Sequence, residues 1–205
     1  MKNLSNIYFK KHNGSYKPFP CNKDETFCVF KEEPLELFLL VFQGEVNIKI
    51  DLKEAGAECC VHCVYLTAED QKARICFDIN HVSAQTKSVQ LIRGIATNQS
   101  IVQFDGMIRM PKDSQRCEGI QNHRAIVLSD KAIVQSTPEL EIYADDVQCT
   151  HGSAIGPLDK EQVFYLQTRG VNEKQAYYLL LSSFLNDLLP LEVQSIVTSW
   201  INDYV

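Results

Sequence analysis

The chain has 205 residues, of which 45% are hydrophobic and 22% charged, the composition of a folded domain with its own core. Its net charge of -6 lacks the basic surplus of proteins that bind nucleic acid. No apolar run reaches the roughly 18 residues that span a bilayer, and the N-terminus lacks the apolar stretch of a signal peptide, which predicts a cytoplasmic protein with no membrane contact.

The eight cysteines are expected to be reduced thiols, because no secretion signal accompanies them. The densest group is CCVHC at residues 59–63. In a strand, Cys59 and Cys63 share one face but lie roughly 13 Å apart, while Cys60 and His62 point to the other face. This spacing does not suit a metal ion, so we expect these thiols to fill a strand-built core.

Short strands separated by turns are predicted from Leu35 to Ile155, and residues 1–34 form a leading segment. Alternation of apolar and polar residues is clearest in VNIKIDL (46–52) and ICFDI (75–79). The predicted strands are Leu35–Phe42, Glu45–Leu52, Cys60–Leu66, Ala73–Val82, Ser88–Ala96, Ile101–Met110, Ala125–Leu128, Leu140–Tyr143 and Val147–His151.

Strands without intervening helices are typical of a sandwich, a barrel or a β-solenoid. No hairpin signal flanked by strands is apparent, since Asn13-Gly14 lies in the leading segment, and this argues against antiparallel arrangements. No strict repeat period is visible either. The pattern therefore favours a parallel β-helix over residues 35–156, with the sandwich and the barrel left open.

Three helices are predicted in residues 157–205. Asp159 with Gln162 forms a capping box, and Gly170 marks the end of the first helix. Asn172 with Gln175 repeats this arrangement, and Pro190 ends the second helix. An apolar stripe at helical spacing defines the third: Val193, Ile196, Val197, Trp200, Ile201 and Tyr204.

Between strands and helices, residues 138–156 read PELEIYADDVQCTHGSAIG and residues 159–170 read DKEQVFYLQTRG. These segments closely resemble the signature of the SufB/SufD family of iron–sulfur cluster assembly proteins, and the CTHG version at 149–152 looks like the SufD branch. SVQLIRG (88–94), FDGMIR (104–109) and IVLSD (126–130) also resemble family segments, in the family's order. The resemblance covers roughly residues 79–189.

The resemblance implies a right-handed parallel β-helix flanked by helices, a scaffold subunit rather than an enzyme. Its implied partners are a SufB-like subunit and the ATPase SufC, with which it assembles a transient iron–sulfur cluster that the isolated chain does not bind. Family members usually carry an additional N-terminal helical region, whereas here the strand pattern starts at Leu35. Whether the isolated chain forms a homodimer is left open.

The resemblance points to Cys149 and His151 as cluster-assembly residues and metal ligands. Their chemistry agrees, because thiolate and imidazole both bind iron and residues i and i+2 of a strand share a face. His123 lies near the register of a functional cysteine in the SufB branch, but we interpret it as a surface histidine. The alternative for Cys149 and His151 is a thiol in the core and a histidine held by the backbone.

The C-terminal helices are expected to dock the ATPase, because the resemblance implies it and because apolar residues cover more than one face of the helix over 172–189. The expected contact residues are Phe164, Tyr165, Leu179, Leu180 and Phe184. A competing hypothesis is a carbohydrate-active enzyme, since β-helices are common among polysaccharide lyases and hydrolases. The sequence shows no cluster of carboxylates for that chemistry, so we expect no catalytic residues.

Overall fold

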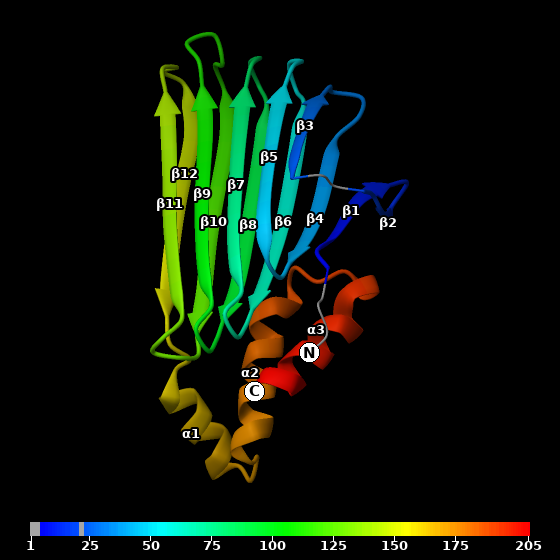
Figure 1. The fold of residues 1–205 in the computed structure, drawn as a ribbon. Coiled ribbons are helices and arrows are strands. Elements are labelled where there is room, and N and C mark those ends of the chain that lie inside the picture. The colour runs from blue at the N-terminus through cyan, green and yellow to red at the C-terminus, as the bar shows by residue number, and fades with distance from the viewer. Residues whose placement is uncertain (1–4, 21–22) are drawn as a thin grey trace.

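The computed structural model describes residues 5–20 and 23–205, and its strands wind as a parallel β-helix with three C-terminal helices along one side of the stack of coils (Figure 1). One sheet, sheet A, has the strand order β12-β10-β8-β6-β4-β1-β2, and the other, sheet B, has the order β11-β9-β7-β5-β3. The strands are β1 (Ile7–His12), β2 (Ser15–Pro18), β3 (Asp24–Val29), β4 (Leu35–Val41), β5 (Gly44–Leu52), β6 (Glu58–Thr67), β7 (Lys72–His81), β8 (Lys87–Ala96), β9 (Ile101–Met110), β10 (Cys117–Val127), β11 (Ile133–Ile142) and β12 (Val147–Gly156).

From β3 to β12 the chain alternates between the two sheets, and every strand pairs in parallel with the strand one coil away. This confirms the parallel β-helix. Cys59 lies opposite Ser88, and Ser88 lies opposite Gly119, so these two successive coils differ in length by two residues. A repeat that varies in this way explains why the sequence shows no strict period.

The core fills the space between the inner faces of the two sheets. Each strand contributes alternate side chains to it, as the burial of β5 and β7 shows. Large contributors that are fully buried include Leu37, Leu39, Ile48, Ile50, Tyr65, Phe77 and Phe104. Cys59 and Cys63 lie in this core as expected.

The N-terminal end of the β-helix is closed by a hairpin that the sequence analysis did not predict. Asn13 and Gly14 have φ angles of 50° and 79°, and they form the tight turn between β1 and β2, the conformation that Asn-Gly favours. Strand β1 pairs antiparallel with β4. The aromatic rings of Tyr8, Phe19 and Phe27 pack against the end of the core. Three strands thus precede Leu35, and the tight hairpin signal was present after all.

The helices are α1 (Lys160–Thr168), α2 (Glu173–Asn186) and α3 (Leu191–Tyr204). The Asp159 side chain accepts the backbone N–H of Glu161, and Asn172 accepts the N–H of Gln175, so both predicted N-caps are confirmed. Gly170, with φ of 87°, follows the end of α1 as predicted.

Helices α2 and α3 cover part of the outer face of sheet A. Together with the turn between them, they contribute these buried side chains to a second hydrophobic core: Leu181, Leu185, Leu188, Val193, Val197, Trp200 and Ile201. The sheet contributes side chains on the outer face of β4, β6 and β8 and just beyond the end of β4. Among them are Phe38, Leu40, Phe42, Val64, Leu66 and Ile95. The second core explains why β4 and β6 are buried on both faces near their C-terminal ends.

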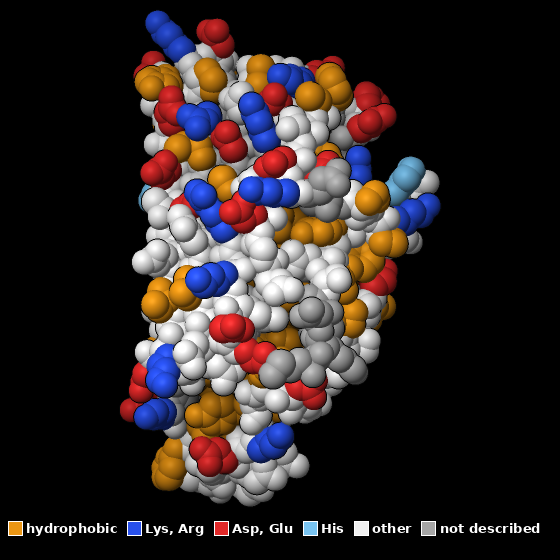
Figure 2. All heavy atoms as spheres, viewed as in Figure 1, with side chains coloured by type: hydrophobic (Ala, Val, Ile, Leu, Met, Phe, Trp, Pro, Cys, Tyr) orange, Lys and Arg blue, Asp and Glu red, His pale blue; other side chains and the backbone are white. Residues whose placement is uncertain are grey.

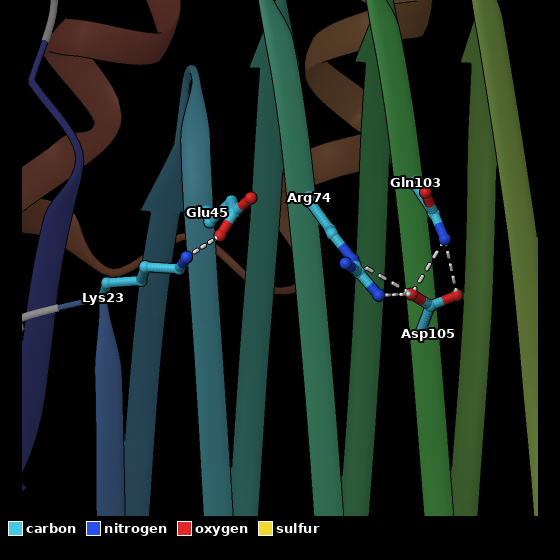
Figure 3. A network of polar contacts seen from close by, with 5 residues as sticks. All are labelled: Lys23, Glu45, Arg74, Gln103 and Asp105. Carbon is cyan, nitrogen blue, oxygen red and sulfur yellow. Dashed lines mark hydrogen bonds and ion pairs between the residues drawn. The ribbon is translucent and has the colours of Figure 1, made fainter.

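The outer face of sheet B is polar and charge-paired. Arg74 and Gln103 both donate to Asp105, at 3.2 and 3.0 Å, and Lys23 pairs with Glu45 (Figure 3). Figure 2 shows basic and acidic side chains interspersed over this side of the molecule. Such pairs contribute little to stability individually, so we regard this face as solvated.

None of the helices in the described part of the chain is long and apolar enough to cross a membrane. The cysteines of these residues are free thiols, in agreement with the expected reduced state. Cys21 lies outside the described residues.

Candidate functional site

The last coil, made of β11 and β12, lies at the opposite end from the β1–β2 hairpin and is not covered (Figure 1). No residue of either strand is buried, whereas every second residue of β9 is. Each of the two strands pairs on one side only, with β9 or β10. The coil therefore presents part of its inner face and two free strand edges, which we call the open face.

The register places Cys149, His151 and Ser153 on this open face. They pair with Gly119, Gln121 and His123 of β10, all of which are buried and point inward. A Cβ added to Gly119 would lie only 3.0 Å from Sγ of Cys149, so this thiol also points inward. His151 and Ser153 follow at i+2 and i+4 on the same face of β12.

Cys149 is half-buried in a small apolar cluster. The side chains around it are Ile108, Met110, Cys117, Leu140 and Val147. Burial raises the pKa of the Cys149 thiol to about 11. The thiol is neutral at physiological pH, and it becomes a thiolate ligand only when a metal ion displaces its proton.

The side chain of His151 is exposed and makes no hydrogen bond to any other described residue. Both ring nitrogens therefore face solvent or a partner. A thiol and an imidazole on one face of an edge strand have the chemistry to supply two ligands to a metal ion. Within the described chain, no group of three or more His, Cys, Asp or Glu side chains is arranged to hold a metal ion.

His123 does not lie on the surface, contrary to the interpretation from sequence. Its side chain is fully buried, with Nε2 2.9 Å from the Tyr65 hydroxyl and Nδ1 3.2 Å from Oγ of Ser153. Burial, together with the positive charge of Arg93, lowers its pKa to about 4. The error has a simple cause: β10 begins at Cys117, eight residues before the predicted strand, and this turns His123 inward.

The remaining histidines of the strand region have ordinary partners. His81 is buried, with Nδ1 2.7 Å from Oγ1 of Thr86 and Nε2 2.8 Å from Oγ of Ser88, so both ring nitrogens are occupied within the core. Nε2 of His62 lies 3.2 Å from Sγ of Cys60 on the outer face of β6, away from Cys59 and Cys63. The CCVHC segment thus divides between two faces, as its spacing predicts.

Sequence reasoning missed the polar interior beneath the open face. Gln121 lies opposite His151 and donates from Nε2 to Oε1 of Gln90 at 3.0 Å, while its own Oε1 has no partner among the described residues. Oγ of Ser136, on β11, is also buried and has no hydrogen-bond partner in the described part of the chain. Gln121 lies two residues after Gly119, the partner of Cys149, and Ser136 pairs with the buried Phe104, so both inward positions follow only once the register is known.

A second exposed feature lies on the first two helices. Phe164, Tyr165 and Leu179 are 66%, 58% and 47% exposed, and we call them the helical patch. Leu180 and Phe184, also expected at this surface, are half-buried. Leu180 contributes to an adjoining cavity of about 380 Å³, together with Asp159, Glu161, Gln162, Tyr165 and Leu166.

Comparison with known proteins agrees with the fold and the motifs. The domain family described as SUF system FeS cluster assembly, SufBD core domain, matches residues 43–184. The iron–sulfur cluster assembly protein SufD of Escherichia coli is 33% identical over 110 residues, 54% of this chain and 26% of that protein. A SufBD family protein of Synechocystis is 37% identical over 111 residues, 54% of this chain and 24% of that protein.

The chloroplastic protein ABCI7 of Arabidopsis thaliana is 40% identical over 86 residues, which is 42% of this chain and 18% of that protein. The matched segments thus span about a quarter or less of the length of these relatives. The family match covers more than half of the chain and includes β5 to β12 of the β-helix, with the segment that carries Cys149 and His151. The chain therefore belongs to the SufBD family of iron–sulfur cluster assembly proteins, with SufD among its relatives.

Proposed function

We propose that this chain is a non-catalytic scaffold subunit that assembles an iron–sulfur cluster together with a second, SufB-like chain. The observation that carries the proposal is the open face, where a thiol and an imidazole lie on an uncovered edge strand. Iron–sulfur clusters generally take four protein ligands. Cys149 and His151 supply two, so the second chain completes the set.

The shape of the open face supports such a partner. A free strand edge offers unpaired N–H and C=O groups to another strand. Exposed apolar side chains line the two edge strands: Ile133, Ile142 and Ile155. An added chain would bury these side chains and enclose Cys149, and the cluster is then the cargo held between the subunits.

The helical patch is proposed to dock a SufC-like ATPase. Helices α2 and α3 bury one apolar side against sheet A, yet Phe164, Tyr165 and Leu179 are left exposed on the neighbouring surface of α1 and α2. Aromatic side chains with a large exposed area are frequent anchors of protein interfaces. The ATPase would supply the nucleotide hydrolysis that the scaffold lacks.

The test is the iron and sulfide content of the complex after co-expression with SufB-like and SufC-like subunits and anaerobic purification. His151→Ala should lower the cluster content several-fold and leave the subunit ratio unchanged, because it removes a ligand and no packing contact. His12→Ala, a histidine exposed on β1, is the matched control. A His151→Ala complex with wild-type iron and sulfide would overturn the proposed site.

A further inference from the structure

A chain of hydrogen bonds connects the deep interior to the open face. The Tyr65 hydroxyl lies 2.9 Å from Nε2 of His123, and Nδ1 of His123 lies 3.2 Å from Oγ of Ser153. The imidazole is held between the rings of Tyr65 and Phe104, with centroid distances of 5.8 and 5.1 Å. Ser153 itself is exposed on β12, two residues beyond His151.

The burial of Tyr65 determines which atom donates in each of these hydrogen bonds. If Nε2 of His123 carried the proton, it would donate to Tyr65, and the buried Tyr65 O–H would have no acceptor among the described residues. Buried donors without an acceptor are rare in proteins because they cost a full desolvation penalty. The tyrosine therefore donates to Nε2, and the imidazole proton is on Nδ1.

The same logic then determines the role of Ser153. Nδ1–H of His123 donates to Oγ, which uses an acceptor position of the serine and leaves its own proton free to donate elsewhere. His123 has a pKa near 4, lowered chiefly by burial, so it is neutral at physiological pH and this polarity is retained. The free O–H lies on the same face of β12 as Cys149 and His151.

We propose that Ser153 donates a hydrogen bond to a sulfide of the cluster assembled on the open face, and that Tyr65 and His123 are positioning residues that hold Ser153 in this role. The inference deepens the function proposed above and rests on it. Hydrogen bonds to cluster sulfurs stabilise their negative charge and influence the reduction potential. Ser153 would thus stabilise the growing cluster without being a ligand.

The first test needs no partner. The isolated chain, labelled with ¹⁵N-histidine, is examined by long-range ¹H–¹⁵N NMR spectroscopy at pH 8, where the shifts of the two ring nitrogens show which one carries the proton. His123 should be protonated on Nδ1. Tyr65→Phe removes the donor to Nε2 and should increase the share of the Nε2–H form. A wild-type His123 protonated on Nε2 would overturn the proposed polarity.

The second test measures the cluster in the co-expressed complex. Ser153→Ala should reduce the iron and sulfide content at least twofold and lower the reduction potential of the remaining cluster. Ser153→Thr keeps the hydroxyl and should restore both. Thr150→Ala, an exposed hydroxyl on the opposite face of β12, should have no effect.

The outcomes separate the two proposals. If His151→Ala lowers the cluster content while Ser153→Ala matches wild type, the site is correct and the role of Ser153 is wrong. If His151→Ala has no effect, the proposed site fails, whereas the histidine tautomer remains a separate result. If Ser153→Ala lowers the melting temperature, Ser153→Thr, which keeps the hydroxyl, serves as the comparison. Loss of the cluster in both variants would contradict a role of the hydroxyl.

Discussion

The ring of Tyr65 occupies the place where a side chain on Gly94 would stand. The two residues pair between β6 and β8, and a Cβ on Gly94 would lie 1.8 Å from Cζ of the tyrosine. The ring crosses over β8 through this space and reaches His123 on β10. A glycine on one strand thus permits a hydrogen bond between two others.

Gly94→Ala should therefore destabilise the chain by about 3 kcal/mol, since the added methyl group overpacks a rigid core and displaces Tyr65 from His123. Urea denaturation measures the free energy of unfolding. Gly156→Ala is the matched control, because a Cβ there meets nothing within 4 Å. Equal stabilities of the two variants would contradict this account of the packing.

The free energy of unfolding should decrease as the pH is lowered below about 6.5. His81 and His123 are buried with pKa values near 4, against about 6.5 in the unfolded chain. Between these values only the unfolded state takes up the protons, so acid favours unfolding, whereas above 6.5 neither residue contributes. Each histidine should lower the free energy of unfolding by about 2 kcal/mol at pH 5 relative to pH 7.

Replacing His123 by glutamine removes one of the two titrating groups. Urea denaturation of wild type and His123→Gln at pH 7 and pH 5 isolates this contribution from that of the carboxylates. The variant is expected to lose about 2 kcal/mol less than wild type over the interval. An identical loss in both proteins would show that His123 is not neutral in the folded state.

Cys149 should react slowly with alkylating agents in the isolated chain, despite its place at an uncovered end. Its raised pKa of about 11 leaves little thiolate at neutral pH, and the thiolate is the reactive form. Iodoacetamide at pH 7.5, followed by peptide mass spectrometry, should modify the exposed Cys28 at least tenfold faster. In 6 M urea the two rates should converge; a fast Cys149 in the folded chain would contradict its burial among apolar side chains.

The helical patch should be required for binding of the SufC-like ATPase. Phe164→Ser combined with Leu179→Ser should weaken binding at least tenfold in a pull-down or calorimetric titration and should leave the melting temperature unchanged, because both side chains are exposed. Leu191→Ser, at an 81% exposed position on α3, is the control. Unchanged affinity of the double variant would locate the contact elsewhere.

Deleting α2 and α3 is not an equivalent test. These helices cover Phe38, Leu66 and Ile95 on the outer face of sheet A, so their removal would expose a second hydrophobic core. We expect such a truncated chain to aggregate, which would abolish ATPase binding for reasons unrelated to the patch.

The sequence predicted the elements with strong local signals. Runs of apolar and alternating residues predicted β4 to β9, and capping residues such as Asn172 predicted where helices begin. Strands β10 and β11 were predicted too short, because inward positions there carry Gln121, His123 and Ser136 instead of apolar residues. Their burial depends on neighbouring coils, which local periodicity does not reveal. The turn at Asn13 carried its signal, but the strands around it are short.

The pair Cys149 and His151 was predicted from the family resemblance. Its two-residue spacing predicted a shared face, which the register confirms, whereas its role as a ligand pair stays a prediction. Ser153 was not found, because a serine on an exposed strand has no distinguishing signal in the sequence. Its position above His123 follows from the parallel register alone. The register between neighbouring strands, not the composition, determines which polar residues lie side by side.

Coils in a stack are stabilised mainly by their nearest neighbours, and β11 and β12 have a neighbouring coil on one side only. Local opening should therefore cost least at this end, and amide hydrogens of the last coil should exchange with solvent before those of β6 or β8. A partner chain that pairs with the free edge adds the missing neighbour. On the proposed function, binding of the partner and ordering of the last coil would be one thermodynamic event, and Cys149 and His151 would become rigid only in the complex.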